Sequence, residues 1–211
     1  MKMASCSSYI FVSLIFHAIW LICSTQLLVS GKGDKTYVQE ACSNYVQEAC
    51  SVTRYRDVCI HSLSPFSSSA KNSPSRWARA GVSVSLSEAK SATRYLVTLK
   101  THGGGLKGRN EVALSDCIEC FQNAIDELHK SLDVLRTLTK MTFDTKMADL
   151  NTWLSAALTN GDTCLDGFEG QNGKPVKLLQ DRVLKVTYIT SNALALVNKL
   201  ATTGLGSLPN L

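Results

Sequence analysis

The sequence has few aromatic residues, few prolines and no long run of one charge. Aromatic side chains make up 7% of the 211 residues, and there are only 4 prolines. Since β-sandwiches depend on strands rich in aromatic and β-branched residues, this composition favours an all-α protein. Lys and Arg number 22 against 17 Asp and Glu, an excess too small and too dispersed to indicate nucleic-acid binding. With 45% hydrophobic residues, the chain can bury a core and is not expected to be disordered.

The sequence also lacks the motifs of common metal, nucleotide and esterase sites. His61, His102 and His129 include no pair spaced i, i+4, which a zinc motif such as HExxH requires. Since no glycine-rich phosphate-binding loop is present either, we predict neither a metal ion nor a cofactor. The run from His102 to Gly105 matches the oxyanion-hole glycines of some esterases. No GxSxG nucleophile motif accompanies it, so we interpret the run as a break between helices.

The first 31 residues have the pattern of a secretory signal peptide. Lys2 precedes an apolar run from about Tyr9 to Cys23, and compact residues follow at Val29–Gly31. An uncleaved membrane anchor is the alternative, but the polar residues 24–26 interrupt the apolar run. We therefore predict that the mature chain is secreted, has no membrane contact after cleavage, and keeps six of the 8 cysteines in an oxidising compartment.

A tandem octamer follows the signal. Tyr37–Asn44 and Tyr45–Val52 are identical at seven of eight positions. Two copies are too few for a stacked repeat protein, which needs at least three units. We interpret them as a local duplication that lengthened a lead-in over residues 32–48 and left Cys42 as a surplus copy of Cys50.

Four segments with helical periodicity follow a Ser- and Pro-rich connector at Ser62–Ser75. Their apolar residues recur at i+3 and i+4, the pattern of helices with one buried face. The segments run from about Trp77 to Lys100, from Asp116 as N-cap to Leu138, from Met147 to a stop at Asn160–Gly161, and from Leu179 to Leu200 before Gly204. Four such segments with short breaks predict an up-and-down four-helix bundle.

The cysteines allow two disulfides. Cys50 and Cys59 would hold the residues before the bundle as a hairpin. Cys117 begins one helix and Cys164 ends the next, so an antiparallel pair brings them within bonding distance. The alternative, a redox or half-zinc site at Cys117 and Cys120, lacks both a βαβ context and a second cysteine pair.

A polar stripe follows the second helix of the bundle. Glu119, Asn123 and Asp126 are spaced i, i+4 and i+7, apart from the apolar stripe that contains Phe121. Such a stripe is a solvated face or a docking surface. If two carboxylates of this stripe catalysed glycoside hydrolysis, they would have to lie in a cleft, and a convex helix surface does not form one. We therefore predict a binding protein and not an enzyme.

Several motifs together resemble the plant invertase and pectin methylesterase inhibitor family, from about Ala49 to Leu205. They are Cys50-x8-Cys59, Leu106–Arg109, Ala113–Cys117, Asn123–Leu128, Trp153–Thr159, Asp162–Glu169 and Thr190–Leu194. The resemblance implies one inhibitor domain over residues 49–205, in which a helical hairpin packs on a four-helix bundle. It also implies disulfides Cys50–Cys59 and Cys117–Cys164, location in the apoplast or cell wall, and no catalysis.

The resemblance further implies a one-to-one complex in which one face of the bundle covers the pectin-binding cleft of pectin methylesterase. The matching positions are Glu119, Phe121, Asp126, Thr163 and Asp166. Asn123 lies at a position where an acidic residue is common in the family.

The target inside the family is either pectin methylesterase or an acid invertase. The invertase-directed branch tends to carry a Pro-Lys-Phe motif between the second and third helices, and Lys140–Lys146 lacks it. We therefore expect pectin methylesterase as the partner, with acid invertase as the alternative. A third hypothesis is a cell-wall protein that binds pectin directly through its excess positive charge.

Overall fold

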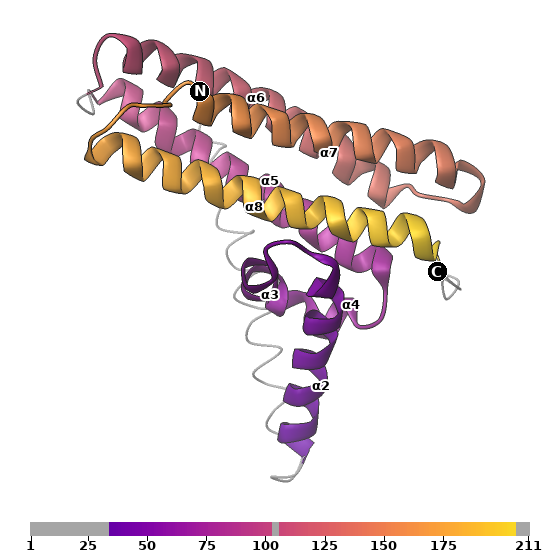
Figure 1. Ribbon diagram of the computed structural model, residues 1–211. Coiled ribbons are helices and arrows are strands. Elements are labelled where there is room, and N and C mark those ends of the chain that lie inside the picture. Colours follow the sequence, from indigo (N-terminus) through magenta and orange to yellow (C-terminus); the bar gives the residue numbers. More distant parts are fainter. Residues whose placement is uncertain (1–33, 103–105, 206–211) are drawn as a thin grey trace, which may run out of the picture.

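The computed structural model describes residues 34–102 and 106–205, and within these residues it contains no β-strand (Figure 1). The predicted signal peptide at residues 1–31 lies outside the described residues. None of the described helices is long and apolar enough to cross a membrane.

Four long helices form the bundle that the sequence predicts. They are α5 (Pro74–Thr101), α6 (Arg109–Arg136), α7 (Phe143–Asp166) and α8 (Lys174–Thr203). Each packs on the next along the chain, and α8 closes the bundle by packing on α5. Figure 1 shows α6 and α7 as one layer, α5 and α8 as the other, and the N-terminal helices beneath the second layer.

The apolar stripes of the four helices meet in one core. Leu96, Phe121, Leu154 and Leu179 each expose 1% or less of their surface. Burying one large apolar side chain stabilises a fold by about 1.5–3 kcal/mol, so these stripes supply the main driving force for assembly.

The predicted N-cap at Asp116 and the predicted stop at Asn160–Gly161 are both wrong. The second bundle helix begins at Arg109 after an N-cap at Gly108, so Asp116 lies inside the helix and does not cap it. The apolar stripe already begins at Ala113 and Leu114, which are buried, and this burial extends the helix toward its N-terminus.

The third bundle helix does not stop at Asn160–Gly161 but continues to Asp166. A Cβ atom at position 161 would lie 2.8 Å from Oγ1 of Thr187 on α8. The glycine therefore allows α7 and α8 to approach closely, and the packing offsets its low helix propensity.

The N-terminal hairpin consists of five helical segments. They are α2 (Asp34–Ala49), η2 (Cys50–Val52), α3 (Arg56–Leu63), η3 (Ser64–Phe66) and α4 (Ser67–Ala70). The predicted disulfide Cys50–Cys59 joins η2 to α3, with Cα atoms 5.8 Å apart.

The stretch Ser62–Ser75 is therefore not the irregular connector that we expected. Ser67 and Ala70 on α4 are buried, and the indole N–H of Trp77 donates to the Lys71 carbonyl at 2.7 Å. These contacts with the start of α5 order a segment whose composition alone favours a loop.

The hairpin has its own apolar cluster against the bundle. Val46, Leu63 and Trp77 form it together with Leu196 of α8, and all four are nearly inaccessible to solvent. Val46 belongs to the second copy of the octamer, so that copy takes part in the packing. The hairpin thus covers part of the α5–α8 layer and leaves the α6–α7 layer open (Figure 1).

Candidate binding surface on helices α6 and α7

A disulfide ties α6 to α7 at one end of the bundle. Cys117 and Cys164 are bonded, with Cα atoms 4.4 Å apart, as the sequence suggested. Close by, a Cβ atom placed on Gly167 would lie 3.4 Å from the Ala113 Cβ, so the two backbones are in near contact. The relative register of α6 and α7 is therefore fixed where the predicted contact residues lie.

Five of the six residues predicted to bind a target are exposed on the two helices that this disulfide joins. Glu119, Asn123 and Asp126 lie on α6, and Thr163 and Asp166 lie on α7. Thr163 flanks Cys164, and its hydroxyl donates to the Thr159 carbonyl at 2.9 Å, so its methyl group and the acceptor side of the hydroxyl are left to contact a partner.

Phe121 does not belong to this surface. Its side chain is 1% exposed and packs in the bundle core. A partner cannot reach it, so its assignment as a contact residue is corrected: Phe121 supports the surface from below. The apolar periodicity of the sequence, which placed Phe121 in the buried stripe, already predicted this burial.

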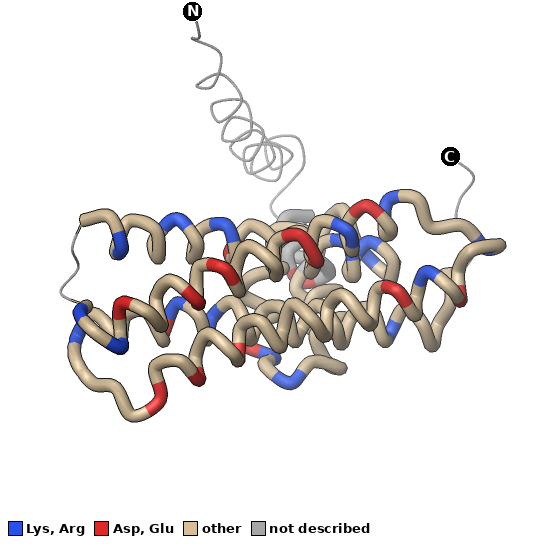
Figure 2. Tube along the Cα trace, turned by 90° about the horizontal axis from the view of Figure 1, so that it is seen from above, with Lys and Arg blue, Asp and Glu red and all other residues tan. Residues whose placement is uncertain are grey.

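The surface is strongly acidic. Together α6 and α7 carry ten Asp and Glu against four Lys and Arg, a net charge of −6. Figure 2 views the bundle from the α6–α7 side, and the acidic positions in red recur along both helices. Among the described residues of this pair, only Glu127 and Asp133 form ion pairs, with Lys130 and Arg136. Near the disulfide, Asp116 and Asp162 are also exposed and lack a basic partner.

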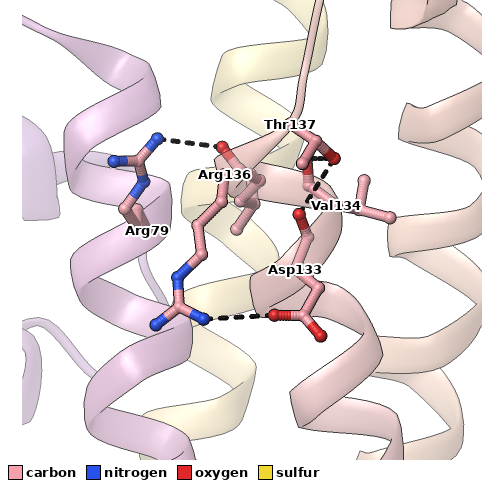
Figure 3. Close-up of polar contacts among 6 residues, drawn as sticks. Arg79, Asp133, Val134, Arg136 and Thr137 are labelled. Atoms are coloured by element: carbon pink, nitrogen blue, oxygen red, sulfur yellow. Dashed lines mark hydrogen bonds and ion pairs between the residues drawn. The ribbon is translucent and has the colours of Figure 1, made fainter.

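The far end of α6 is held by local polar contacts (Figure 3). Arg79 of α5 donates to the Leu135 carbonyl at 3.1 Å, and Arg136 pairs with Asp133 at 3.1 Å. The Thr137 hydroxyl donates to the Asp133 carbonyl at 3.0 Å and closes the helix. Asp133 and Arg136 at this end are thus paired with each other, in contrast to the unpaired carboxylates of Asp116 and Asp162 beside the disulfide.

Cys120 lies in the same region as a free thiol of intermediate exposure. Burial raises the pKa of the Cys120 thiol, and the neighbouring Glu119 and Asp116 carboxylates raise it further. Since Cys117 is bonded to Cys164, Cys117 and Cys120 are not a redox pair. The raised pKa keeps Cys120 protonated and weakly nucleophilic at neutral pH.

The described residues offer no assembled metal site. Within them, no group of three or more His, Cys, Asp and Glu side chains lies close enough to hold a metal ion. His102 is exposed at the end of α5, where its Nδ1 contacts the Thr98 carbonyl at 3.1 Å, and residues 103–105 lie outside the described residues. What the α6–α7 surface offers is a rigid, convex, acidic face suited to binding.

Known proteins are similar to this chain in sequence and fold. Residues 44–196 match the model of a family described as plant invertase/pectin methylesterase inhibitor. The chain is 47% identical over 172 residues to pectinesterase inhibitor 6 of Arabidopsis thaliana. This alignment covers 81% of this chain and 78% of that protein. It is 37% identical over 156 residues to pectinesterase inhibitor 9 of the same plant, covering 71% of this chain and 76% of the relative.

The fold is similar to that of a solved structure. The crystal structure of mutant form A of a pectin methylesterase inhibitor from Arabidopsis aligns with a TM-score of 0.57 at 20% identity. The alignment covers 71% of this chain and 92% of that one. At this identity the comparison supports the architecture of hairpin and bundle.

Proposed function

The chain belongs to the plant invertase/pectin methylesterase inhibitor family, and from this membership we propose that it is a secreted, non-enzymatic inhibitor of pectin methylesterase in the plant cell wall. The named relatives support the target: two of them, at 47% and 37% identity, are pectinesterase inhibitors. The pattern of a signal peptide in residues 1–31 supports secretion.

The observation that carries the mechanism is the exposed acidic surface of α6 and α7, defined by Glu119, Asn123, Asp126, Thr163 and Asp166. Its helices are tied by Cys117–Cys164, and its carboxylates lack basic partners among the described residues. A rigid surface loses little conformational entropy on binding, and unpaired charges are free to complement a partner. These features support docking of this surface as a single rigid body.

We infer that inhibition is steric. A convex bundle face inserted over a substrate cleft excludes a polymer without any chemistry by the inhibitor. One surface of this kind per chain corresponds to a one-to-one complex. Because the surface is charged and exposed, its affinity should fall as salt screens the carboxylates over a Debye length of about 8–10 Å at physiological ionic strength.

The test is a parallel titration of the chain from residue 32 onward against a plant pectin methylesterase and an acid invertase. We expect loss of esterase activity at a one-to-one ratio, with invertase unaffected. Inhibition of invertase alone would retain the family and overturn the target. If neither enzyme is inhibited while circular dichroism shows an intact helical fold, the proposed function is wrong.

A further inference from the structure

The bundle is divided into two layers of opposite charge. The α6–α7 layer has a net charge of −6, whereas α5 and α8 together carry ten Lys and Arg against two Asp and Glu, a net charge of +8. The pairs pack back to back, so the acidic and basic faces point in opposite directions (Figure 1). The overall excess of positive charge is therefore concentrated on one layer.

The hairpin covers only one half of the basic layer. It contacts the first half of α5 and the second half of α8, which lie side by side in the antiparallel pair. The uncovered half of α8 extends from Lys185 back to Lys174, about 17 Å at 1.5 Å per residue. Lys174, Lys177, Arg182 and Lys185 are exposed along it.

Aromatic rings lie beside the cations along this uncovered half and at its border with the hairpin. The guanidinium of Arg182 lies 4.3 Å from the ring centroid of Tyr95 on α5. Six residues further along α8, where the hairpin begins to cover it, Tyr188 stacks on Tyr55 of the hairpin with centroids 3.9 Å apart, and the Arg54 guanidinium lies 5.6 Å from the Tyr55 ring centroid. All three tyrosines are half-buried, so each ring is held in place and still reaches solvent.

Most of these cations have no acidic partner. Among the described residues of α5 and α8, Lys185 alone forms an ion pair, with Glu88 at 3.0 Å. Unpaired cations along one strip focus a positive potential outward, and guanidinium groups bind carboxylates through paired hydrogen bonds. Tyrosine rings add apolar faces with a polar edge.

We propose that this basic surface, defined by Arg54, Tyr55, Tyr95, Arg182, Lys185, Tyr188 and Lys174, binds de-esterified polygalacturonate. A chain of uronic acids presents a carboxylate on each sugar and an apolar ring face between them, which matches cations lying beside tyrosines. The choice of this polyanion rests on the proposed function, because a pectin methylesterase converts neutral methyl esters into these carboxylates. The surface lies opposite α6–α7, so both can be occupied together.

The experiment measures retention of the chain from residue 32 onward on immobilised polygalacturonate, with fully methyl-esterified pectin as the neutral matrix and no enzyme present. The test variant is Arg182→Glu/Lys185→Glu, with Arg182→Gln/Lys185→Gln as a milder version. Lys130→Glu/Lys140→Glu is the matched control, since it changes the net charge equally on the opposite side. Circular dichroism verifies the fold of each variant.

We expect the parent chain to be retained on polygalacturonate, with retention that falls as salt is added. The test variant should raise the apparent Kd about tenfold or more, the glutamine version should raise it less, and the control should change it little. Three outcomes overturn the proposal: no retention of the parent, equal loss in test and control variants, or equal binding to duplex DNA or phosphatidylserine vesicles. Retention without esterase inhibition would refute the proposed function but support polygalacturonate binding by this surface. Inhibition without retention would refute only polygalacturonate binding.

Discussion

Asn192 on α8 pairs both polar atoms of its side-chain amide with the main chain of Tyr55, 137 positions away in the sequence. Its Oδ1 accepts from the Tyr55 N–H at 3.1 Å, and its Nδ2 donates to the Tyr55 carbonyl at 2.8 Å. Asn192 is 2% exposed. One buried amide thus satisfies two main-chain groups just before α3 and docks the hairpin on the bundle.

Replacing Asn192 with Asp should make stability depend on pH. The new carboxylate still accepts from the Tyr55 N–H but faces the Tyr55 carbonyl without a proton to donate. We expect a loss of about 2 kcal/mol in unfolding free energy at pH 7. Burial and the carbonyl raise the folded-state pKa of this carboxyl above about 3.9, the ordinary value for Asp that applies in the unfolded chain. The stability of the variant is therefore greatest below about pH 3.9 and falls as the pH rises from there to the folded-state pKa, above which the loss is complete.

Urea unfolding of the Asn192→Asp variant between pH 4 and 8 measures this effect relative to the parent. Asn198→Asp is the matched control, because Asn198 is exposed on the same helix. An Asn192→Asp variant whose deficit stays constant across this pH range would show that the amide does not hold Tyr55 in solution.

The helices and the bundle could be predicted because the apolar stripes are long and regular. Their ends could not, since the start of α6 depends on burial of Ala113 and the continuation of α7 depends on contact between Gly161 and Thr187. Tertiary contact likewise orders residues 64–70, where Ser and Pro favour a loop.

The candidate surface could be predicted only in part. Helical spacing and the resemblance together indicated exposed polar positions beside the disulfide, but the resemblance also included Phe121, which the structure buries. The division of charge between layers could not be read along the chain. It depends on which helices share a layer, and α5 and α8, the first and last bundle helices, share the basic one.

Removing the inter-helix disulfide should cost more stability than removing the hairpin disulfide. In the loop-entropy model, closing the 47-residue separation of Cys117 and Cys164 contributes about 4 kcal/mol, against about 2.5 kcal/mol for the 9-residue separation of Cys50 and Cys59. Guanidinium unfolding of the two paired Cys→Ser variants compares these values. Cys120→Ser should change stability by less than about 1 kcal/mol, and a larger cost for the hairpin bond would contradict this ranking.

Gly161→Ala should destabilise the protein although alanine favours a helix by about 1 kcal/mol. The added methyl would lie 2.8 Å from Thr187 Oγ1, which itself donates to the Val183 carbonyl at 3.2 Å. We expect a loss of about 1–2 kcal/mol in the parent background.

Thr187→Ala removes the clashing atom, so Gly161→Ala should be neutral or stabilising in that background. The double-mutant cycle, measured by thermal unfolding, isolates this contact. Equal effects of Gly161→Ala in both backgrounds would mean that the close approach of α7 and α8 does not depend on this pair.

Asp166→Arg should weaken inhibition of pectin methylesterase by about tenfold or more without weakening the fold. It reverses an exposed charge at the last residue of α7, and a cation there interacts favourably with the helix dipole, so stability should be equal or slightly higher. Thr163→Trp, on the same side of α7, should weaken inhibition by bulk alone. The measurement is the inhibition constant, accompanied by far-ultraviolet circular dichroism and thermal unfolding.

Asp133→Arg is the control for this prediction, because it makes the same charge change near the end of α6. Position 133 lies 16 residues beyond Cys117, about 24 Å along the helix, and its side chain is 70% exposed. It should leave inhibition nearly unchanged. If Asp166→Arg and Thr163→Trp both inhibit like the parent, the partner does not bind beside the disulfide. If Asp133→Arg weakens inhibition as much as Asp166→Arg, the partner responds to the charge of the whole acidic layer and not to a local contact.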